Sequence, residues 1–389
     1  MNRLVATVSK TVVFAILYVC GSYAAQAGNT VPIRANESAD TRHGSVNRVD
    51  GISVQSGVVI VAQAAADSRI KNELIASFDL VATIPVRWGE WTVYVEGSTT
   101  PLANRVSSVL GSANADAGSA LDRDNSGRFQ VSELHYSFPW KNGRLVTGLL
   151  DTHAFLDFSQ VANDETSQFL ASPFVNNPTI EFPDYVLGVI YNYKARHDAG
   201  FTLVMTSSHG LADNTNASYS QLFDIGESGK GLFLAAETQW KLSGFKFHTG
   251  LWSNTADHSY LNGNSGMGIN YGAYMSIDWA QGKSLWNLRL GMANRKVSKA
   301  DTFMSVVMEY PVVNHTLGVG IASTGLSSDG SGINEDNVLQ AEMYMRFDIT
   351  RTFTVTPSIQ LIRNSGFDSS GTLFDKNQKL LGVRLNFMF

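Results

Sequence analysis

Residues 122–133 read DRDNSGRFQVSE and have the oxygen-bearing side chains and spacing of a calcium-binding loop. Asp122, Asp124, Ser126, Gly127 and Glu133 follow the EF-hand pattern of alternate acidic or polar residues, a glycine and a final glutamate. In such a loop alternate side chains supply oxygen ligands, the glycine permits a sharp turn, and the last glutamate binds the ion with both oxygens. Taken alone, the stretch predicts a calcium site.

The flanking residues favour a different structure. An EF-hand loop needs a helix on each side, but residues 111–121 (GSANADAGSAL) show no helical apolar stripe. Residues 134–140 (LHYSFPW) are apolar at alternate positions, which is typical of a strand. We therefore predict a polar loop that ends in a turn and leads into a strand carrying Glu133, with no resident metal. Calcium held by Asp122 and Asp124 alone is the lesser alternative.

The same two-residue period dominates the chain from residue 51 onward. In residues 380–389 (LLGVRLNFMF) apolar side chains fall on one face, whereas the other face carries an arginine, an asparagine, a glycine and a methionine. We expect sixteen such strands, near residues 51–62, 73–84, 91–98, 130–140, 144–152, 185–195, 201–210, 231–243, 245–255, 268–281, 284–296, 302–312, 315–325, 337–349, 352–363 and 380–389. Short turns such as 281–283 join some of them, and long polar stretches such as 364–378 join others.

This pattern predicts an all-β fold, a transmembrane antiparallel β-barrel of about 16 strands over residues 51–389. Side chains cannot fill so wide a barrel, so the apolar face must point outward into lipid. Closure also leaves no unpaired backbone edge in the hydrocarbon. A secreted β-sandwich or β-propeller is the alternative that the alternation leaves open.

The first residues indicate export. Residues 1–27 have a basic start at Arg3 and Lys10, an apolar run and a small-residue AQA ending, which predicts a signal peptide. Residues 28–50 are polar and aperiodic, and we expect a flexible periplasmic N-terminal segment. The chain is not basic, with 29 Lys and Arg against 34 Asp and Glu, so nucleic acid is not an expected partner. No cofactor is expected.

Several short motifs occur in order within residues 130–193. The block opens with Gln130, Ser132, Glu133 and Tyr136, and continues with AND at 162–164, QFL at 168–170 and VNNP at 175–178. It resembles the carbohydrate-selective porins of the OprB type. The resemblance implies a sixteen-stranded, sugar-admitting channel in the bacterial outer membrane, and it places Glu133 on a lumen-facing strand.

Strand parity selects the side chains that would line such a channel. Both charge signs occur on the inward face, which suits neutral solutes rich in hydroxyl groups, and aromatic rings can stack on a sugar. The candidate sugar contacts are Glu96, Glu133, Trp252, Arg289, Glu309, Glu342, Tyr344 and Arg346. For any one of them, a role in merely keeping a wide lumen wet is the alternative.

Residues 153–185 form a connection too long and too rich in phenylalanine to be an idle loop. We predict that this constriction loop folds into the barrel mouth and narrows it, with residues 162–170 as a short helix. Asn163, Asp164, Phe169, Asn176 and Asn177 are its expected functional residues.

The expected function is passive, substrate-selective diffusion of mono- or oligosaccharides. A plugged structural or surface-binding barrel is the second hypothesis, and an outer-membrane hydrolase is the third. The sequence contains neither an H-E-x-x-H zinc motif nor a G-x-S-x-G nucleophile elbow, so no enzyme is predicted. Expected partners are outer-membrane lipid, carbohydrate solutes and, through Phe389, the barrel assembly machinery. The sugar, and the choice between monomer and homotrimer, stay open.

Overall fold

The computed structural model describes residues 47–49, 51–118, 120–124, 126–194, 199–211, 218–223, 230–329, 337–364 and 377–389. The predicted signal peptide, residues 1–27, lies outside these residues. So does most of the predicted N-terminal segment, residues 28–50, although residues 47–49 form a short strand.

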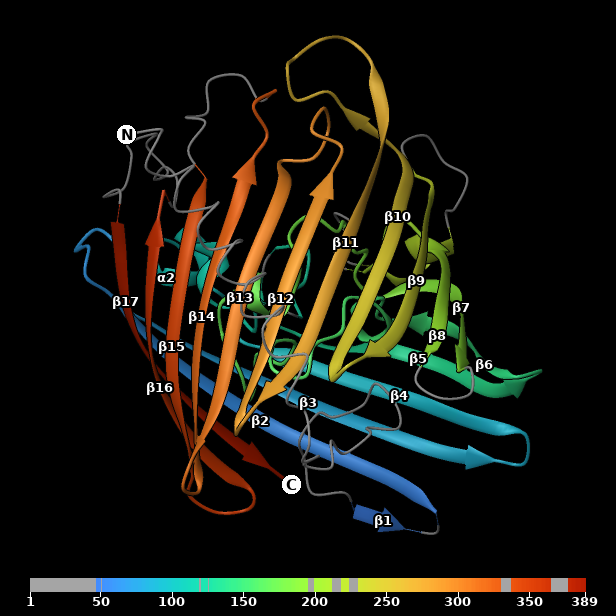
Figure 1. Ribbon diagram of the computed structural model, residues 1–389. Helices are drawn as coiled ribbons and strands as arrows, with labels where there is room; N and C mark the ends of the chain where they lie inside the picture. The colour runs from blue at the N-terminus through green and yellow to red at the C-terminus, as the bar shows by residue number, and fades with distance from the viewer. Residues whose placement is uncertain are drawn as a thin grey trace.

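Strands make up most of the described chain (Figure 1). The short strand β1 spans Asn47–Val49. The wall consists of β2 (Ile52–Ala65), β3 (Glu73–Val86), β4 (Gly89–Ser98), β5 (Phe129–Trp140), β6 (Gly143–Leu150), β7 (Val186–Lys194), β8 (Ala199–Ser207), β9 (Leu232–Leu242), β10 (Phe245–Ser259), β11 (Met267–Gln281), β12 (Ser284–Ala293), β13 (Ala300–Val312), β14 (His315–Leu326), β15 (Val338–Asp348), β16 (Phe353–Arg363) and β17 (Asn377–Met388).

These sixteen wall strands close into a barrel. Each of them pairs antiparallel with the next, and β17 pairs with β2 from Leu380↔Ala65 to Met388↔Gly57. The strand β1 forms a hairpin with the first residues of β2. The predicted fold class, a closed antiparallel barrel of sixteen strands, is confirmed.

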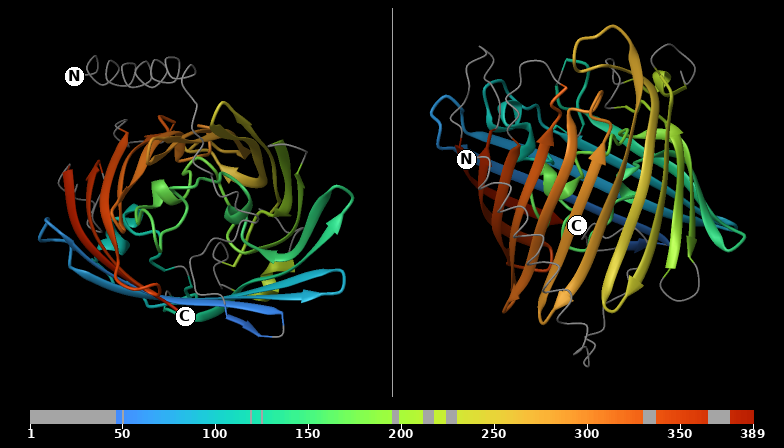
Figure 2. Two further views of the ribbon diagram at one scale, coloured as in Figure 1. Left: turned by 60° about the horizontal axis from the view of Figure 1, so that its bottom comes forward. Right: turned by 45° about the horizontal axis from the view of Figure 1, so that its top comes forward.

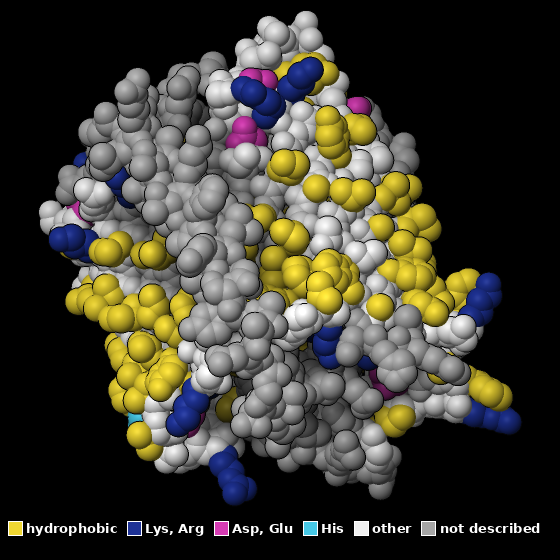
Figure 3. Space-filling view, in the orientation of Figure 1, with side chains coloured by type: hydrophobic (Ala, Val, Ile, Leu, Met, Phe, Trp, Pro, Cys, Tyr) yellow, Lys and Arg dark blue, Asp and Glu magenta, His cyan; other side chains and the backbone are white. Residues whose placement is uncertain are grey.

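The alternation in the sequence explains which way each side chain points. On β10 the outward Leu251 is 66% exposed, whereas the inward His248 and Trp252 are each 3% exposed. Figure 3 shows apolar side chains spread over the outer face, with Lys and Arg mainly toward its upper and lower margins. An apolar exterior of this kind suits lipid contact, because lipid replaces the water that would disfavour it.

Aromatic rings stack in pairs on neighbouring strands near the short turns. Trp240 lies against Phe247 at 4.0 Å, and Trp279 lies against Trp286 at 5.9 Å between ring centroids. Tryptophan and tyrosine are enriched where membrane meets water. These pairs fit an aromatic belt at the membrane interface.

The two ends of the barrel differ. At the end that we call the turn end, tight turns join the strands, as at Ser243 and Gly244, both with positive φ, between β9 and β10. At the opposite end, the loop end, longer segments connect them, including residues 99–128 between β4 and β5 and residues 151–185 between β6 and β7. Short turns at one end and long loops at the other are typical of outer-membrane barrels.

The helical elements are all short. They are α2 (Val106–Val109), α3 (Ser172–Val175), and the 3-10 turns η1 (Gly111–Ala113), η2 (His153–Phe155) and η3 (Tyr219–Phe223). Among the residues that the structure describes, no helix is long and apolar enough to cross a membrane.

We predict that Leu251→Arg, near the middle of β10, lowers the free energy of unfolding by about 2–4 kcal/mol, because it places a charge on the lipid face. Urea titration in lipid vesicles, followed by tryptophan fluorescence, measures the change. Leu251→Ala is the control, since it shortens the side chain without adding charge. Equal stability of the arginine variant and the control would contradict an outward, lipid-facing Leu251.

Candidate functional site

The constriction loop, residues 153–185, runs inside the ring of strands (Figure 2, left). Its apolar side chains form two buried clusters with the inner face of the wall. Leu156 and Ile180 belong to a cluster with side chains of β6 to β11, and Phe169 and Phe174 belong to one with side chains of β13 to β15. Packing on two sides of the wall fixes the path of the loop across the lumen.

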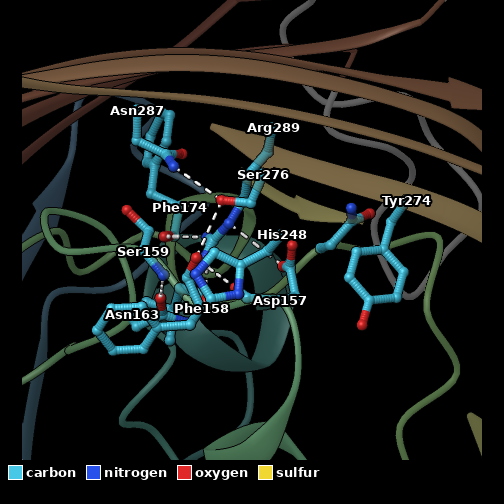
Figure 4. Close-up of polar contacts among 12 residues, drawn as sticks. Asp157, Phe158, Ser159, Asn163, Phe174, His248, Tyr274, Ser276, Asn287 and Arg289 are labelled. Carbon is cyan, nitrogen blue, oxygen red and sulfur yellow. Dashed lines mark hydrogen bonds and ion pairs between the residues drawn. The ribbon is translucent and has the colours of Figure 1, made fainter. Parts of the chain in front are cut away.

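Arg289, fully buried on β12, holds the centre of the loop (Figure 4). Its guanidinium donates to the carbonyl oxygens of Phe174, at 2.9 Å, and Val175, at 3.3 Å, from one nitrogen, and to that of Asp157, at 2.9 Å, from another. Its Nε also lies 3.2 Å from the Asp157 carboxylate. A planar, permanently charged donor suits this task, because it satisfies several buried carbonyl groups at once.

Glu237, on β9, binds the same part of the loop as Arg289 does from β12. Its carboxylate accepts the backbone N–H of Asp157 and the hydroxyl of Tyr274, each at 2.8 Å. The Nδ1 atom of His248 lies 2.7 Å from the second oxygen of Glu237. Asp157 therefore has contacts with β9 through its backbone and with β12 through its side chain, at a strained positive φ of 53°.

The next residues of the loop are bound by Asp278 on β11. Its carboxylate accepts the Ser159 hydroxyl at 3.0 Å and the side-chain amide of Asn287 at 2.9 Å. The Ser276 hydroxyl donates to the carbonyl oxygen of Phe158 at 3.0 Å. Side chains of the wall thus replace the water that would otherwise solvate this segment.

A second set of wall residues binds the loop from β15 and β17. Glu342 accepts the backbone N–H groups of Leu170 and Ala171 at 3.0 and 2.8 Å. Arg346, Arg384 and Asn386 donate to the carbonyl oxygens of residues 165–168. The charged inner face of β15 and β17 therefore binds loop backbone.

These contacts explain why the short helix that we expected over residues 162–170 is wrong. The Asp164 carboxylate accepts the backbone N–H groups of Thr166 and Ser167, and the wall takes the following carbonyl groups. The Gln168 N–H closes one turn on the Asp164 carbonyl, but wall side chains bind the carbonyl groups of residues 165–168, so the turn does not continue as a helix. The helical turn of this region is α3, Ser172–Val175, which begins with a proline in its first turn.

A second segment is inserted into the barrel, and the sequence did not predict it. Residues 99–128, which we call the second loop, place η1 against the inner wall, where Gln63 and Gln360 donate to the Ala113 carbonyl at 3.1 and 2.9 Å. The two loops touch, because the Ala115 N–H donates to the Leu170 carbonyl at 2.8 Å. The available signal was the helical spacing of Val106, Val109 and Leu110 inside a polar stretch; Val106 and Leu110 are buried.

The stretch with the calcium-loop spacing forms a hairpin in the second loop. Leu121 and Gly127 form an antiparallel bridge, and the Asp124 carboxylate accepts the N–H and the hydroxyl of Ser126. Glu133 lies on β5, which begins at Phe129, as the alternation predicted. Among the described residues, no three His, Cys, Asp or Glu side chains are close enough together to hold a metal ion.

A β-bulge explains the Q-x-S-E motif that carried the resemblance. Tyr94 pairs with Glu133 and Val95 pairs with Val131, so Ser132 is an extra residue on β5. The two neighbours Ser132 and Glu133 are both buried, because the bulge brings both to the inner face. Glu133 then lies 3.3 Å from the ring of His135.

The eight candidate sugar contacts belong to the inner face, and each contacts protein. Arg289, Glu342 and Arg346 bind the constriction loop, and Glu96 accepts the hydroxyl of Tyr185 at 2.5 Å where that loop ends. Trp252 stacks on Phe233, and Tyr344 donates to Glu309. Together with Glu133 beside His135, these contacts give each residue a positioning role, while sugar binding by them stays a prediction.

The five constriction-loop residues brace the loop itself. Asn163 accepts the Ser159 N–H and donates to the Val175 carbonyl, and Asn177 donates to the Leu290 carbonyl of the wall. Phe169 packs in the cluster with Tyr344, and the Asn176 N–H closes the turn of α3. Asn163, Asp164 and Asn176 therefore hold turns within the loop, whereas Phe169 and Asn177 attach it to the wall.

Carboxyl groups of the two loops approach one another. Burial raises the pKa of Asp116, in the second loop, to about 7 and that of Glu165, in the constriction loop, to about 8, and the two charges disfavour each other. Burial lowers the pKa of His153, but the neighbouring Asp151 and Asp184 outweigh it and raise that pKa to about 9. In all three cases the protonated form fits the docked loops better.

Known proteins share this architecture. Residues 283–389 match the family described as "Carbohydrate-selective porin, OprB family". The structure of Pseudomonas putida OprB is similar, with a TM-score of 0.66 and 15% identity over 87% of this chain and 94% of that one. The expected resemblance to OprB porins is confirmed.

The porin fold extends to other outer-membrane proteins. OmpT of Vibrio cholerae matches with a TM-score of 0.54 and 12% identity, over 88% of this chain and all of that one. An uncharacterized protein of Aquifex aeolicus is 26% identical over 212 residues, which cover 49% of this chain and 64% of that protein. Porins of this fold are typically channels of the outer membrane rather than enzymes.

We predict that Arg289→Met destabilises the docked constriction loop by about 3–5 kcal/mol, because Asp157 then loses its buried charge partner. Limited proteolysis should cut within residues 153–185, and single channels should lose a uniform conductance. Arg295→Met is the matched control, since the Arg295 side chain is 59% exposed. Adding Asp157→Asn should restore part of the protection; no recovery would contradict the pairing.

Raising the pH should loosen the contact between the loops. The raised pKa values of Asp116 and Glu165 mean that their stabilising contribution is complete below about pH 4 and is lost as the pH rises through 7 to 8. Open-channel current noise should therefore grow by about twofold or more between pH 5 and pH 9. The Asp116→Asn, Glu165→Gln variant should show little change, and an unchanged pH dependence in it would refute this assignment.

Proposed function

We propose that the protein is a passive diffusion channel for carbohydrates in the bacterial outer membrane. The proposal rests chiefly on one observation: the constriction loop, residues 153–185, runs inside the barrel and is bound by buried charged side chains of β9, β12, β15 and β17. A loop held in this way would set the width of the pore without filling the lumen. The family match of residues 283–389 supports carbohydrate as the solute class.

The electrostatics of the lumen support a neutral solute. Acidic and basic groups lie close together on the inner face, as with Arg289 beside Asp157 and Arg346 beside Asp348. Paired charges of opposite sign give little net field along the pore, so neither cations nor anions are strongly favoured.

The other expectations belong to the same proposal. Residues 1–27 would direct export, residues 28–50 would lie in the periplasm, and the assembly machinery would recognise Phe389. The loop end of the barrel would then face the outside of the cell. Diffusion alone needs no catalytic residue, and we propose none.

Planar-bilayer recording tests this function directly. Purified protein should insert in discrete conductance steps, and neutral mono- or oligosaccharides should reduce the current in a concentration-dependent way. Channels that conduct but are insensitive to every neutral sugar tested would overturn the carbohydrate assignment. Absence of conductance would favour the plugged barrel, and a lipid-hydrolysis assay would then separate it from a hydrolase.

Deleting residues 160–180 should increase the single-channel conductance about twofold or more and weaken block by sugars, because this segment occupies the lumen. Heat-modifiable migration in gels checks that the barrel still folds. Replacing the same segment with a Gly–Ser chain of equal length is the matched control, since it retains mass but removes the wall contacts. An unchanged conductance after the deletion would contradict the proposed constriction.

A further inference from the structure

A cavity of about 260 Å³ lies at the loop end, where the constriction loop returns to the wall. Three segments form it: the end of that loop, the residues after β8 and the last residues of β10. We call it the vestibule pocket. The side chains that matter for its chemistry are Glu181, Phe182, Ser208, His209, Asp257 and His258.

One side of the vestibule pocket is fixed by a charged network. The two carboxylate oxygens of Glu181 lie 2.8 Å from His258 Nε2 and 2.8 Å from the Asn270 amide, which donates to it. The other ring nitrogen of His258 lies 2.8 Å from the carbonyl oxygen of Ala256. Because both ring nitrogens face acceptors, His258 carries both protons and compensates the charge of Glu181.

The opposite side is fixed by backbone contacts. Ser208 exchanges hydrogen bonds with Gly231, since its N–H donates to the Gly231 carbonyl at 3.0 Å and its hydroxyl accepts the Gly231 N–H at 2.9 Å. The same hydroxyl lies 2.8 Å from Nδ1 of His209. This contact leaves Nε2 of His209 as the ring nitrogen that can meet a ligand.

An aromatic ring completes the vestibule pocket. Phe182 packs against the ring of His153, with centroids 4.1 Å apart, and lies 6.3 Å from Phe233. The half-buried ring is therefore held in place and offers a fixed apolar surface. An aromatic surface beside hydrogen-bonding groups matches a sugar ring, which has apolar C–H faces and a polar edge.

The geometry points to a binding subsite for one neutral sugar ring in the vestibule pocket, which rests on the proposed channel function. The cavity is slightly smaller than sites that enclose drug-sized ligands, so it suits a single ring. Asp257, exposed at the edge, supplies a carboxylate that accepts hydroxyl groups, and His209 supplies a further donor or acceptor. With Glu181 balanced by His258, the carboxylate of Asp257 disfavours anionic sugars.

The position of the vestibule pocket indicates how the subsite would act. The same loop that crosses the lumen supplies Glu181 and Phe182, so a sugar bound there lies at the entrance to the narrowed pore. Weak binding at an entrance raises the local solute concentration, and release into the pore stays fast when the binding is weak. The subsite would therefore increase flux at low sugar concentration.

The test uses the Asp257→Asn, His209→Gln variant. Both residues line the vestibule pocket, and Nδ1 of His209 contacts the Ser208 hydroxyl rather than the constriction loop. Current-noise analysis with D-glucose added at the loop end should show the apparent dissociation constant for block rising about fivefold to tenfold. Heat-modifiable migration in gels, equal to that of the wild type, checks that the variant barrel folds. The ratio of block by D-glucuronate to block by D-glucose should be higher in the variant than in the wild type.

Asp301→Asn is the matched control, since Asp301 lies at the loop end of β13 and outside the vestibule pocket. It should leave block by D-glucose unchanged. Equal block of the wild type and the double variant would overturn the subsite while leaving the channel function intact. If D-glucose and other neutral sugars fail to block the wild type, the carbohydrate assignment itself fails and the subsite with it.

Discussion

The buried guanidinium of Arg289 is the interaction on which the interior depends. A chain segment inside a barrel brings backbone groups away from bulk water, and each of them needs a partner. Arg289 supplies donors to three carbonyl groups and charge to Asp157, from a strand that is itself fixed on both sides by its neighbours. Glu342, three strands further along the wall on β15, supplies acceptors to backbone N–H groups. Because donors and acceptors are both rigid, the loop between them is rigid too.

The exterior could be predicted from the sequence because one period governs it. Lipid requires apolar side chains at every second position and closed backbone pairing, and these two constraints identify sixteen strands and their facing. The same parity placed Arg289 and Glu342 inside correctly. It could not reveal that their partners are backbone groups of the constriction loop, because parity gives a direction and not a distance.

The contacts inside the barrel were harder to predict from the sequence, because parity gives no distances. The expected helix at residues 162–170 failed because wall side chains more than a hundred positions away compete for its backbone groups. The second loop escaped notice because its contacts are amide side chains, such as Gln63 and Gln360, that look ordinary on a strand. At Ser132 a bulge reverses parity, so a strict alternation would have misplaced one of the two residues there.

The contacts between the constriction loop and β17 have a consequence for the order of assembly. Arg384 binds the carbonyl of Glu165 across 219 positions of sequence, and β17 is also the strand that closes the barrel on β2. The loop, which joins β6 and β7 at the loop end, can reach Arg384 before β17 pairs with β2 or through the open mouth afterwards. Contacts so distant in sequence form slowly. The pairing of β17 with β2 and the contact of Arg384 with the loop are therefore both expected late in assembly.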